Sequence, residues 1–141
     1  MRFEFVPYER VNDMYFGDER EKVKSKCGVC TYSGRTGYPE DKGYEDSFEI
    51  FALYCDEDEK LEGVNLFPDI SDEDMFLSIG GKEIKLNDEP EELYKALNDL
   101  TDDLTDDGED SGWFSEKLGV MVYCPDETVE SVLLHKKGYE S

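Results

Sequence analysis

The sequence predicts two β-strands, Phe51-Ala52-Leu53-Tyr54-Cys55 and Leu61-Glu62-Gly63-Val64-Asn65-Leu66, which an acidic turn connects. The same pattern returns near the end of the chain, where Val120-Met121-Val122-Tyr123-Cys124 precedes Val129-Glu130-Ser131-Val132-Leu133-Leu134. Apolar, β-branched and aromatic residues on both sides of a polar turn are typical of a β-hairpin. A hairpin that recurs at a fixed spacing indicates an internal duplication, which determines the architecture.

The same offset of about 70 residues aligns other parts of the chain. Tyr15-Phe16-Gly17-Asp18-Glu19 matches Lys85-Leu86-Asn87-Asp88-Glu89 at the end of a strand and the start of a helix. We therefore predict a first repeat over residues 1–70 and a second over residues 71–141, which together form a single compact domain.

Each half is also predicted to begin with a hairpin that leads into a helix. The candidate strands are residues 2–6 and 13–16 in the first half, and residues 75–79 and 82–86 in the second. Gly80-Gly81 between the latter pair tolerates the positive φ of a tight turn. The predicted unit is ββαββ, and the predicted class is α+β, with two tandem repeats whose antiparallel sheets carry two packed helices.

The first helix is expected to begin at Asp18, with Glu21 as the reciprocal member of a capping box and Gly28 as the stop. The second is expected to begin around residues 87–89. Its apolar side chains recur three or four residues apart, which predicts a face buried in the core. These side chains are Leu93, Ala96, Leu97 and Leu100.

Charge restricts the class of partner. The chain has 141 residues, and its 37 acids outnumber 15 Lys and Arg, for a formal charge of −22. Such a surface attracts basic proteins and disfavours nucleic acids and anionic membranes as partners. An alternative is that the charge only keeps the protein soluble or adapts it to high salt. No apolar run approaches the roughly 20 residues that span a bilayer, and an acid interrupts the apolar N-terminus, so a cytoplasmic location is expected.

Motifs for catalysis are missing from the sequence. His135 is the single histidine, and no nucleophile elbow or phosphate-binding loop accompanies it. The segment that begins at Asp103 does not match the EF-hand pattern, because Thr105 and Phe114 occupy positions that require calcium ligands. We expect a non-enzymatic protein without a cofactor.

The four cysteines are expected to be structural. Cys27 and Cys30 have the spacing of a zinc knuckle or a redox pair. Cys55 and Cys124 occupy equivalent repeat positions, and neither has a second cysteine two residues away. We predict that both are small buried strand residues and that no metal is bound.

Two inserted loops are the predicted binding surfaces, because a scaffold of sheets exposes its loops to partners. Residues 31–47 combine tyrosines with glycines, and residues 97–116 contain eight acids and no base. Carboxylates steer a basic partner, while aromatic side chains supply affinity. An alternative for Trp113-Phe114 is that both enter the core at the start of a strand over residues 114–124. The predicted partner-binding residues are Asp102, Asp103, Asp106, Asp107, Glu109, Asp110, Trp113, Phe114, Tyr32, Tyr38 and Tyr44.

Three segments carry a resemblance to a known class of proteins. They are Val11-Asn12-Asp13-Met14-Tyr15-Phe16-Gly17, Leu118-Gly119-Val120-Met121-Val122-Tyr123 and Lys137-Gly138-Tyr139-Glu140. Together with the acidity, they make the chain resemble small immunity proteins encoded beside bacterial polymorphic or contact-dependent toxins. The resemblance implies a role only: the partner is a toxin domain, often a nuclease, whose basic groove the acidic surface blocks.

Two other binding functions remain open. A DNA mimic inhibits a nucleic-acid-binding protein with carboxylates spaced like phosphates. An enzyme inhibitor that resembles the β-lactamase inhibitor proteins uses a duplicated helix-and-sheet plan and binds mainly through aromatic residues. We predict a non-catalytic protein that neutralises a basic partner, with these two as alternatives.

Overall fold

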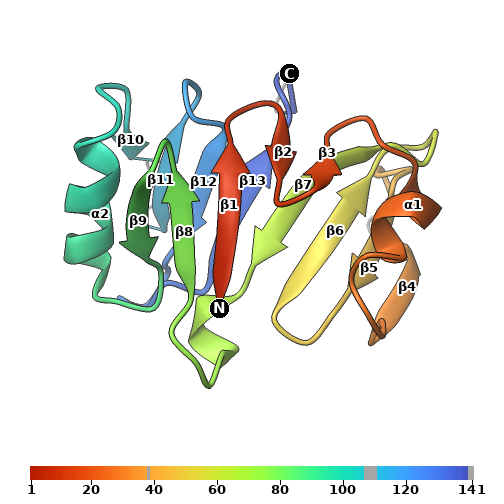
Figure 1. The fold of residues 1–141 in the computed structure, drawn as a ribbon, viewed down its shortest axis with the longest axis horizontal. Coiled ribbons are helices and arrows are strands. Elements are labelled where there is room, and N and C mark those ends of the chain that lie inside the picture. The colour runs from red at the N-terminus through yellow and green to blue at the C-terminus, as the bar shows by residue number, and fades with distance from the viewer. Residues whose placement is uncertain (38, 107–110, 140–141) are drawn as a thin grey trace.

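The structure is a computed structural model, and it describes residues 1–37, 39–106 and 111–139. Two β-sheets lie one in front of the other, with a helix toward each end of the molecule (Figure 1). Antiparallel pairs predominate in both sheets. The α+β class predicted from the sequence is therefore confirmed.

The first sheet has five strands in the order β3-β2-β1-β8-β9. They are β1 (Arg2–Val6), β2 (Arg10–Val11), β3 (Met14–Tyr15), β8 (Phe76–Ile79) and β9 (Lys82–Lys85). β1 and β8 pair in parallel, whereas the other pairs are antiparallel. Because β1 lies in the first half of the chain and β8 in the second, this pair joins the halves.

The second sheet has eight strands in the order β10-β11-β12-β13-β7-β6-β5-β4, and all its pairs are antiparallel. Its strands are β4 (Tyr32–Arg35), β5 (Tyr44–Ser47), β6 (Phe51–Cys55), β7 (Leu61–Leu66), β10 (Thr105–Asp106), β11 (Gly112–Ser115), β12 (Val120–Tyr123) and β13 (Ser131–His135). The hairpins β6–β7 and β12–β13 form where the sequence predicted them. They meet in the middle of the sheet through the β7–β13 pair.

The helices are short. They are α1 (Arg20–Lys24), α2 (Pro90–Asn98) and the 3-10 turn η1 (Pro68–Ile70). The capping box at Asp18 was wrong, because that carboxylate accepts the N–H of Tyr15 at 3.2 Å and α1 begins later. The apolar face of α2 is confirmed: Leu93 and Leu97 are buried. No helix in the described part of the chain is long and apolar enough to cross a membrane.

The predicted hairpins at the start of each half have different outcomes. β8 and β9 pair around Gly80 and Gly81, whose φ values are 58° and 85°, as expected. In the first half, however, the antiparallel partner of β1 is β2 rather than residues 13–16. Asn12 adopts a φ of 54° and its side chain accepts the N–H of Glu4, so the chain turns again and β3 pairs with β2.

The ββαββ unit is not confirmed. Residues 31–47 contain the hairpin β4–β5 instead of a loop, and residues 105–115 contain β10 and β11. The predicted strand over residues 114–124 is two strands, β11 and β12, separated by a turn at Gly119. Within the described ranges, each half therefore has four strands after its helix. Among the described residues, three strands precede α1 whereas two precede α2 in the second half, and the duplication stays a prediction.

The core lies between the two sheets. Leu53, Val64 and Leu134 are neighbours across the eight-stranded sheet, and none of the three is exposed. Phe5 and Leu77 from the five-stranded sheet belong to the same apolar cluster. Because side chains alternate along a strand, the residues between these positions project from the other face of the eight-stranded sheet, here called the outer face.

Candidate partner-binding surfaces

The predicted acidic segment begins at a turn that Asp103 holds together. Its carboxylate accepts hydrogen bonds from Thr101 Oγ1 at 2.5 Å, Ser115 Oγ at 2.6 Å and Lys117 N at 2.9 Å. Burial raises the pKa of Asp103, but the hydrogen bonds outweigh burial and keep the pKa below its ordinary value. Asp103 therefore fixes the loop before β10 to the turn after β11.

Asp102 and Asp106 are exposed acids at this corner. Asp102 forms an ion pair with Lys117 at 2.5 Å, and the hydrogen bond from that ammonium lowers the pKa of Asp102. Asp106 lies on β10, directly opposite Trp113 of β11.

Trp113 and Phe114 point to opposite faces of the sheet. Trp113 is half-buried, packs against the core and meets the ring of Tyr94 from α2 edge-on, with centroids 5.2 Å apart. Tyr94 is 36% exposed. Phe114 pairs with Met121 on the outer face. The interpretation that Trp113 enters the core is therefore correct for that residue, and Tyr94 is an aromatic neighbour that sequence reasoning missed.

Two of the predicted tyrosines lie on the β4–β5 hairpin. Tyr32 is 49% exposed, and its hydroxyl donates to the carbonyl of Arg35 at 2.7 Å. Tyr44 is half-buried, and its ring centroid lies 4.3 Å from the guanidinium of Arg20 and 4.4 Å from that of Arg35. Tyr44 therefore packs within the protein, while Tyr32 faces solvent.

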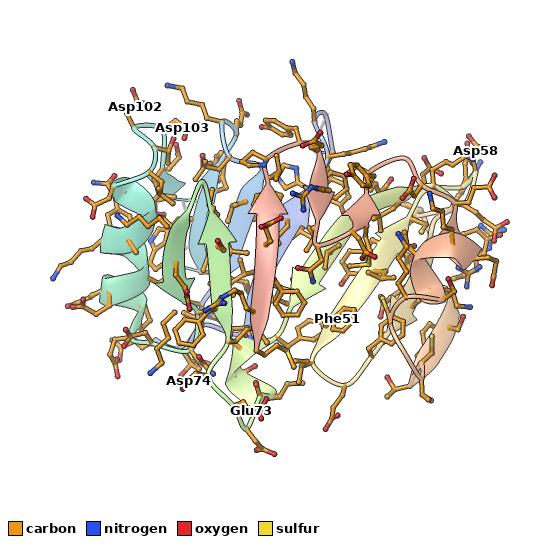
Figure 2. The ribbon with its side chains drawn as sticks, viewed as in Figure 1. Phe51, Asp58, Glu73, Asp74, Asp102 and Asp103 are labelled. Atoms are coloured by element: carbon orange, nitrogen blue, oxygen red, sulfur yellow. The ribbon has the colours of Figure 1, made fainter. Side chains whose placement is uncertain are left out.

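The predicted residues do not form one site. β10 and β4 are the two edge strands of the eight-stranded sheet, seven strand spacings or roughly 30 Å apart. Figure 2 shows Asp102 and Asp103 at one end of the molecule and Asp58 at the other. Tyr38, Asp107, Glu109 and Asp110 lie outside the described residues.

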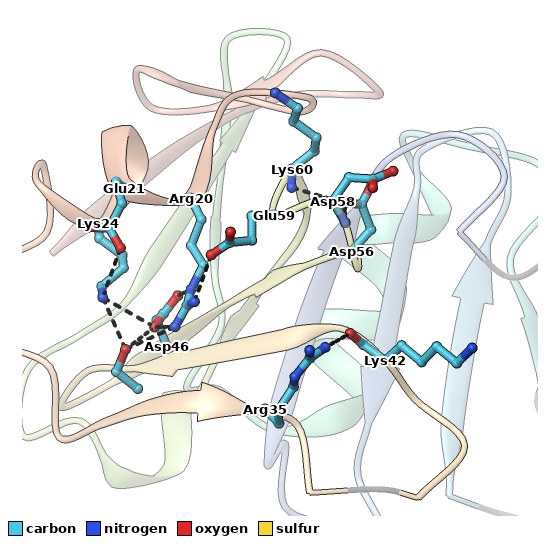
Figure 3. Close-up of polar contacts among 11 residues, drawn as sticks. Arg20, Glu21, Lys24, Arg35, Lys42, Asp46, Asp56, Asp58, Glu59 and Lys60 are labelled. Carbon is cyan, nitrogen blue, oxygen red and sulfur yellow. Dashed lines mark hydrogen bonds and ion pairs between the residues drawn. The ribbon is translucent and has the colours of Figure 1, made fainter.

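A polar cluster that sequence reasoning missed lies under α1 (Figure 3). Asp46 is fully buried, and Arg20 donates to both of its carboxylate oxygens, at 2.8 and 2.9 Å. Ser33 donates to the same carboxylate at 2.6 Å, and Arg20 also reaches Glu59 at 3.1 Å. Burial alone raises the pKa of Asp46, but the hydrogen bonds from Arg20 and Ser33 lower it overall. No signal in the sequence distinguishes Asp46 from the other acids.

The turn between β6 and β7 exposes a second acidic group. Asp56 closes the turn by accepting the N–H groups of Asp58 and Lys60 at 2.9 and 3.0 Å. Glu57 and Asp58 are exposed beside it. Asp58 borders two shallow hollows, of about 570 and 250 Å³, whose linings mix acids with Lys and Arg. Acids and cations therefore lie side by side at this turn, as Asp102 and Lys117 do at the opposite end.

The candidate catalytic and metal-binding residues are packed into the structure. His135 is buried, and its ring lies against those of Tyr8 and Tyr139. Cys55 and Cys124 are both buried, as predicted, but only Cys55 is a strand residue, because Cys124 directly follows β12. Burial raises the pKa of Cys27 to about 11 and that of Cys55 to about 12, which favours the protonated thiol over the nucleophilic thiolate. Among the described residues, no three His, Cys, Asp or Glu side chains lie together as metal ligands.

Comparisons with models of protein families, with curated proteins and with solved structures found no match to this chain.

Proposed function

We propose that this chain is a non-catalytic binding protein that neutralises a basic protein partner, as an immunity protein neutralises its toxin. The charge of −22 supports an electrostatically steered encounter, because 37 acids share only 15 Lys and Arg. The acids therefore outnumber the cations that could pair with them within the chain, which leaves carboxylates for a partner even though Asp102 already pairs with Lys117.

The observation that carries the proposal is the corner formed by α2, β10 and β11. It combines two exposed acids, Asp102 and Asp106, with the partly exposed aromatic pair of Tyr94 and Trp113. Exposed carboxylates accelerate the encounter and pair with Lys or Arg, while aromatic rings contribute affinity once the complex has formed. This is the combination that a basic partner requires.

A DNA-mimic inhibitor is less well supported. Carboxylates that imitate phosphates must follow one another along an extended face. The labelled acids in Figure 2 lie at separate turns instead, with Glu73 and Asp74 far from Asp58 and from Asp102.

The first test is co-expression of this chain with the product of the adjacent reading frame. We expect the chain to restore growth that the neighbouring product inhibits, and the two purified proteins to form a complex whose association slows as salt is added. A neighbouring product that neither inhibits growth nor binds would contradict the proposal.

The second test locates the contact with two variants of equal charge. Asp102→Asn with Asp106→Asn removes the corner acids but leaves Asp103, which the fold needs. Glu57→Gln with Asp58→Asn removes two exposed acids at the opposite end. We expect the first pair to slow association roughly three- to tenfold at low salt and to flatten its salt dependence. The second pair should stay within about twofold of the unmodified protein. Equal effects from both pairs would show that only net charge matters and would remove the corner from the binding site.

A further inference from the structure

The outer face of the eight-stranded sheet carries one continuous row of side chains. Strand partners in register place one residue from each of the eight strands in this row. In sheet order they are Thr105, Phe114, Met121, Leu133, Asn65, Ala52, Ser47 and Tyr32. The row is apolar at Phe114, Met121 and Leu133, which follow the polar Thr105 at the β10 edge, and it is mostly polar toward β4.

The apolar part of the row remains accessible. Phe114, Met121 and Leu133 are half-buried, whereas Leu134, which faces inward, has no exposure. A Cβ at Gly63 would lie only 3.2 Å from Leu133 Cδ1, so the absence of a side chain there keeps the surface beside Leu133 flat.

A shallow hollow continues the apolar area toward η1. It measures about 510 Å³, and its apolar lining comes from Phe67, Ile70 and Tyr123. Ile70 is 59% exposed and Tyr123 is 47% exposed. Large apolar side chains gathered at this exposure on a strongly charged protein indicate a contact surface.

The charges at this surface specify its occupant. Asp69 and Glu130 are the charged residues that line the hollow, and within the described ranges no Lys or Arg forms an ion pair with either. A second copy of the chain is a poor occupant, because two molecules of charge −22 repel each other. Lys and Arg beside an apolar stripe complement both the acids and the apolar surface.

We propose that this outer face, centred on Met121 and Leu133, docks an amphipathic helix of a basic protein partner. The backbone N–H and C=O groups of the strands are already hydrogen-bonded within the sheet. A segment that lies on this face therefore has to form its backbone hydrogen bonds internally, as a helix does. Three strands span roughly 10 Å and successive rows lie roughly 7 Å apart, an area that about two turns of helix cover. The inference that the partner is basic rests on the proposed function. The location of the docking surface is inferred from the side chains on the outer face of the sheet.

The test uses a fluorescein-labelled peptide of about 15 residues, with leucines three and four positions apart and lysines elsewhere. Its control has the same composition, with the leucines distributed around the helix. Fluorescence anisotropy measures the Kd of each peptide for the whole chain. We expect the amphipathic peptide to bind at least about tenfold more tightly than the control.

Three variants locate the peptide. The double variant Met121→Gln with Leu133→Gln should raise the Kd at least about tenfold. The variant Ile70→Ser, which changes an exposed side chain, should raise the Kd about threefold. Val29→Ser removes a residue that is 89% exposed elsewhere on the surface, and its Kd should stay within about twofold of the unmodified protein. Thermal unfolding of each variant confirms that it is folded.

Several results would overturn the proposal. Equal binding of the two peptides would show attraction by charge alone, and unchanged binding by both outer-face variants would place the contact elsewhere. Sedimentation that shows a dimer dispersed by Met121→Gln with Leu133→Gln would assign the face to a second copy. If those substitutions leave growth protection intact while Asp102→Asn with Asp106→Asn abolishes it, the docking face fails and the proposed function stands. If the neighbouring product never binds, the proposed function fails whatever the peptide does.

Discussion

Asp46 and Arg20 form an ion pair that is almost completely withdrawn from water. The Asp46 side chain has no exposure, and that of Arg20 is 10% exposed. Removing two charges from water is unfavourable, and the two hydrogen bonds between them together with that from Ser33 offset the loss. The ion pair fixes α1 to β5. Its contribution to stability requires both residues, because either charge alone would be buried without a full counter-charge.

Replacing one partner should therefore cost more than replacing both. We expect Asp46→Asn to lower the free energy of unfolding by about 3 kcal/mol, because the Arg20 guanidinium loses its buried counter-charge and keeps only Glu59, whose side chain is half exposed. Arg20→Met combined with Asp46→Leu should recover most of that loss. Urea denaturation measures both, with Glu83→Gln as a control, because its ion pair with Arg2 is exposed and contributes at most about 1 kcal/mol. A double variant less stable than Asp46→Asn would contradict this account.

The pH dependence of the same variant checks the charge itself. The pKa of Asp46 is lower in the folded protein than its ordinary value, so ionised Asp46 stabilises the fold. That contribution is complete above the ordinary pKa and is lost as the pH falls through the lower pKa of the folded state. The difference in stability between the unmodified protein and Asp46→Asn should therefore shrink below about pH 4. A difference that stays constant down to pH 2 would indicate a packing effect instead.

Sequence reasoning at this scale identified residue classes but not individual roles. Cys55 and Cys124 were predicted to be buried because strands with equivalent apolar patterns contain them. Among 37 acids, however, nothing local marks Asp46 as buried or Asp103 as a structural acceptor. Both roles depend on partners distant in sequence, Arg20 in the first case and Ser115 in the second.

Elements with a local signature were predictable. Gly80-Gly81 identified the β8–β9 hairpin, and the spacing of Leu93 and Leu97 identified α2. The β4–β5 hairpin was missed, because Tyr32–Arg35 is an edge strand without an apolar alternation. The position of Asp18 also misled, because an aspartate before a helix can bond to the preceding turn as well as to the helix.

The pairing of β11 with β12 depends on a glycine. Gly112 has a φ of 152°, and a Cβ there would lie 1.8 Å from the carbonyl oxygen of Val122 on the neighbouring strand. We expect Gly112→Ala to lower the free energy of unfolding by at least about 3 kcal/mol, because backbone on both strands has to move.

Gly28→Ala is the matched control for this prediction. Its φ is 89°, but no atom lies within 4 Å of the added Cβ. The control measures conformational strain alone, and we expect a loss of about 1 kcal/mol. Equal losses in both variants by urea denaturation would mean that the close approach of β11 and β12 is not what requires glycine.

At the scale of the whole molecule, the charge of −22 opposes compaction. Acids lie at turns at opposite ends of the structure, so their mutual repulsion is distributed over the surface (Figure 2). The large apolar cluster between the sheets overcomes this repulsion.

Screening should consequently stabilise the protein. Raising NaCl from about 0.02 to 0.5 M shortens the Debye length from roughly 20 Å to roughly 4 Å. We expect the Tm to rise by at least about 5 °C, since each kcal/mol shifts the Tm of a domain of this size by several degrees. KCl at equal ionic strength should give the same rise, because screening does not depend on the cation. A Tm that falls or stays constant would show that attractive pairs outweigh the repulsion.

The large-scale topology was the part least accessible from the sequence. Strand patterns predicted most of the central strands, but the parallel pair of β1 and β8 has no local signal. Nothing in either strand specifies a partner more than 70 residues away. The prediction of a single domain built from two ββαββ repeats did not anticipate this parallel pair, because it paired strands only with their neighbours in sequence.

The two strand pairs that connect the halves, β1–β8 and β7–β13, also determine when the early strands can complete their pairing during folding. β1 needs β8, and β7 needs β13, so both early strands stay without one neighbour until the second half of the chain exists. At a synthesis rate of about 5–20 residues per second, that interval lasts about 4–15 s. During this time the nascent chain exposes unpaired strand edges to other molecules. The chain's formal charge of −22 opposes such contacts, because unfinished copies of like charge repel each other.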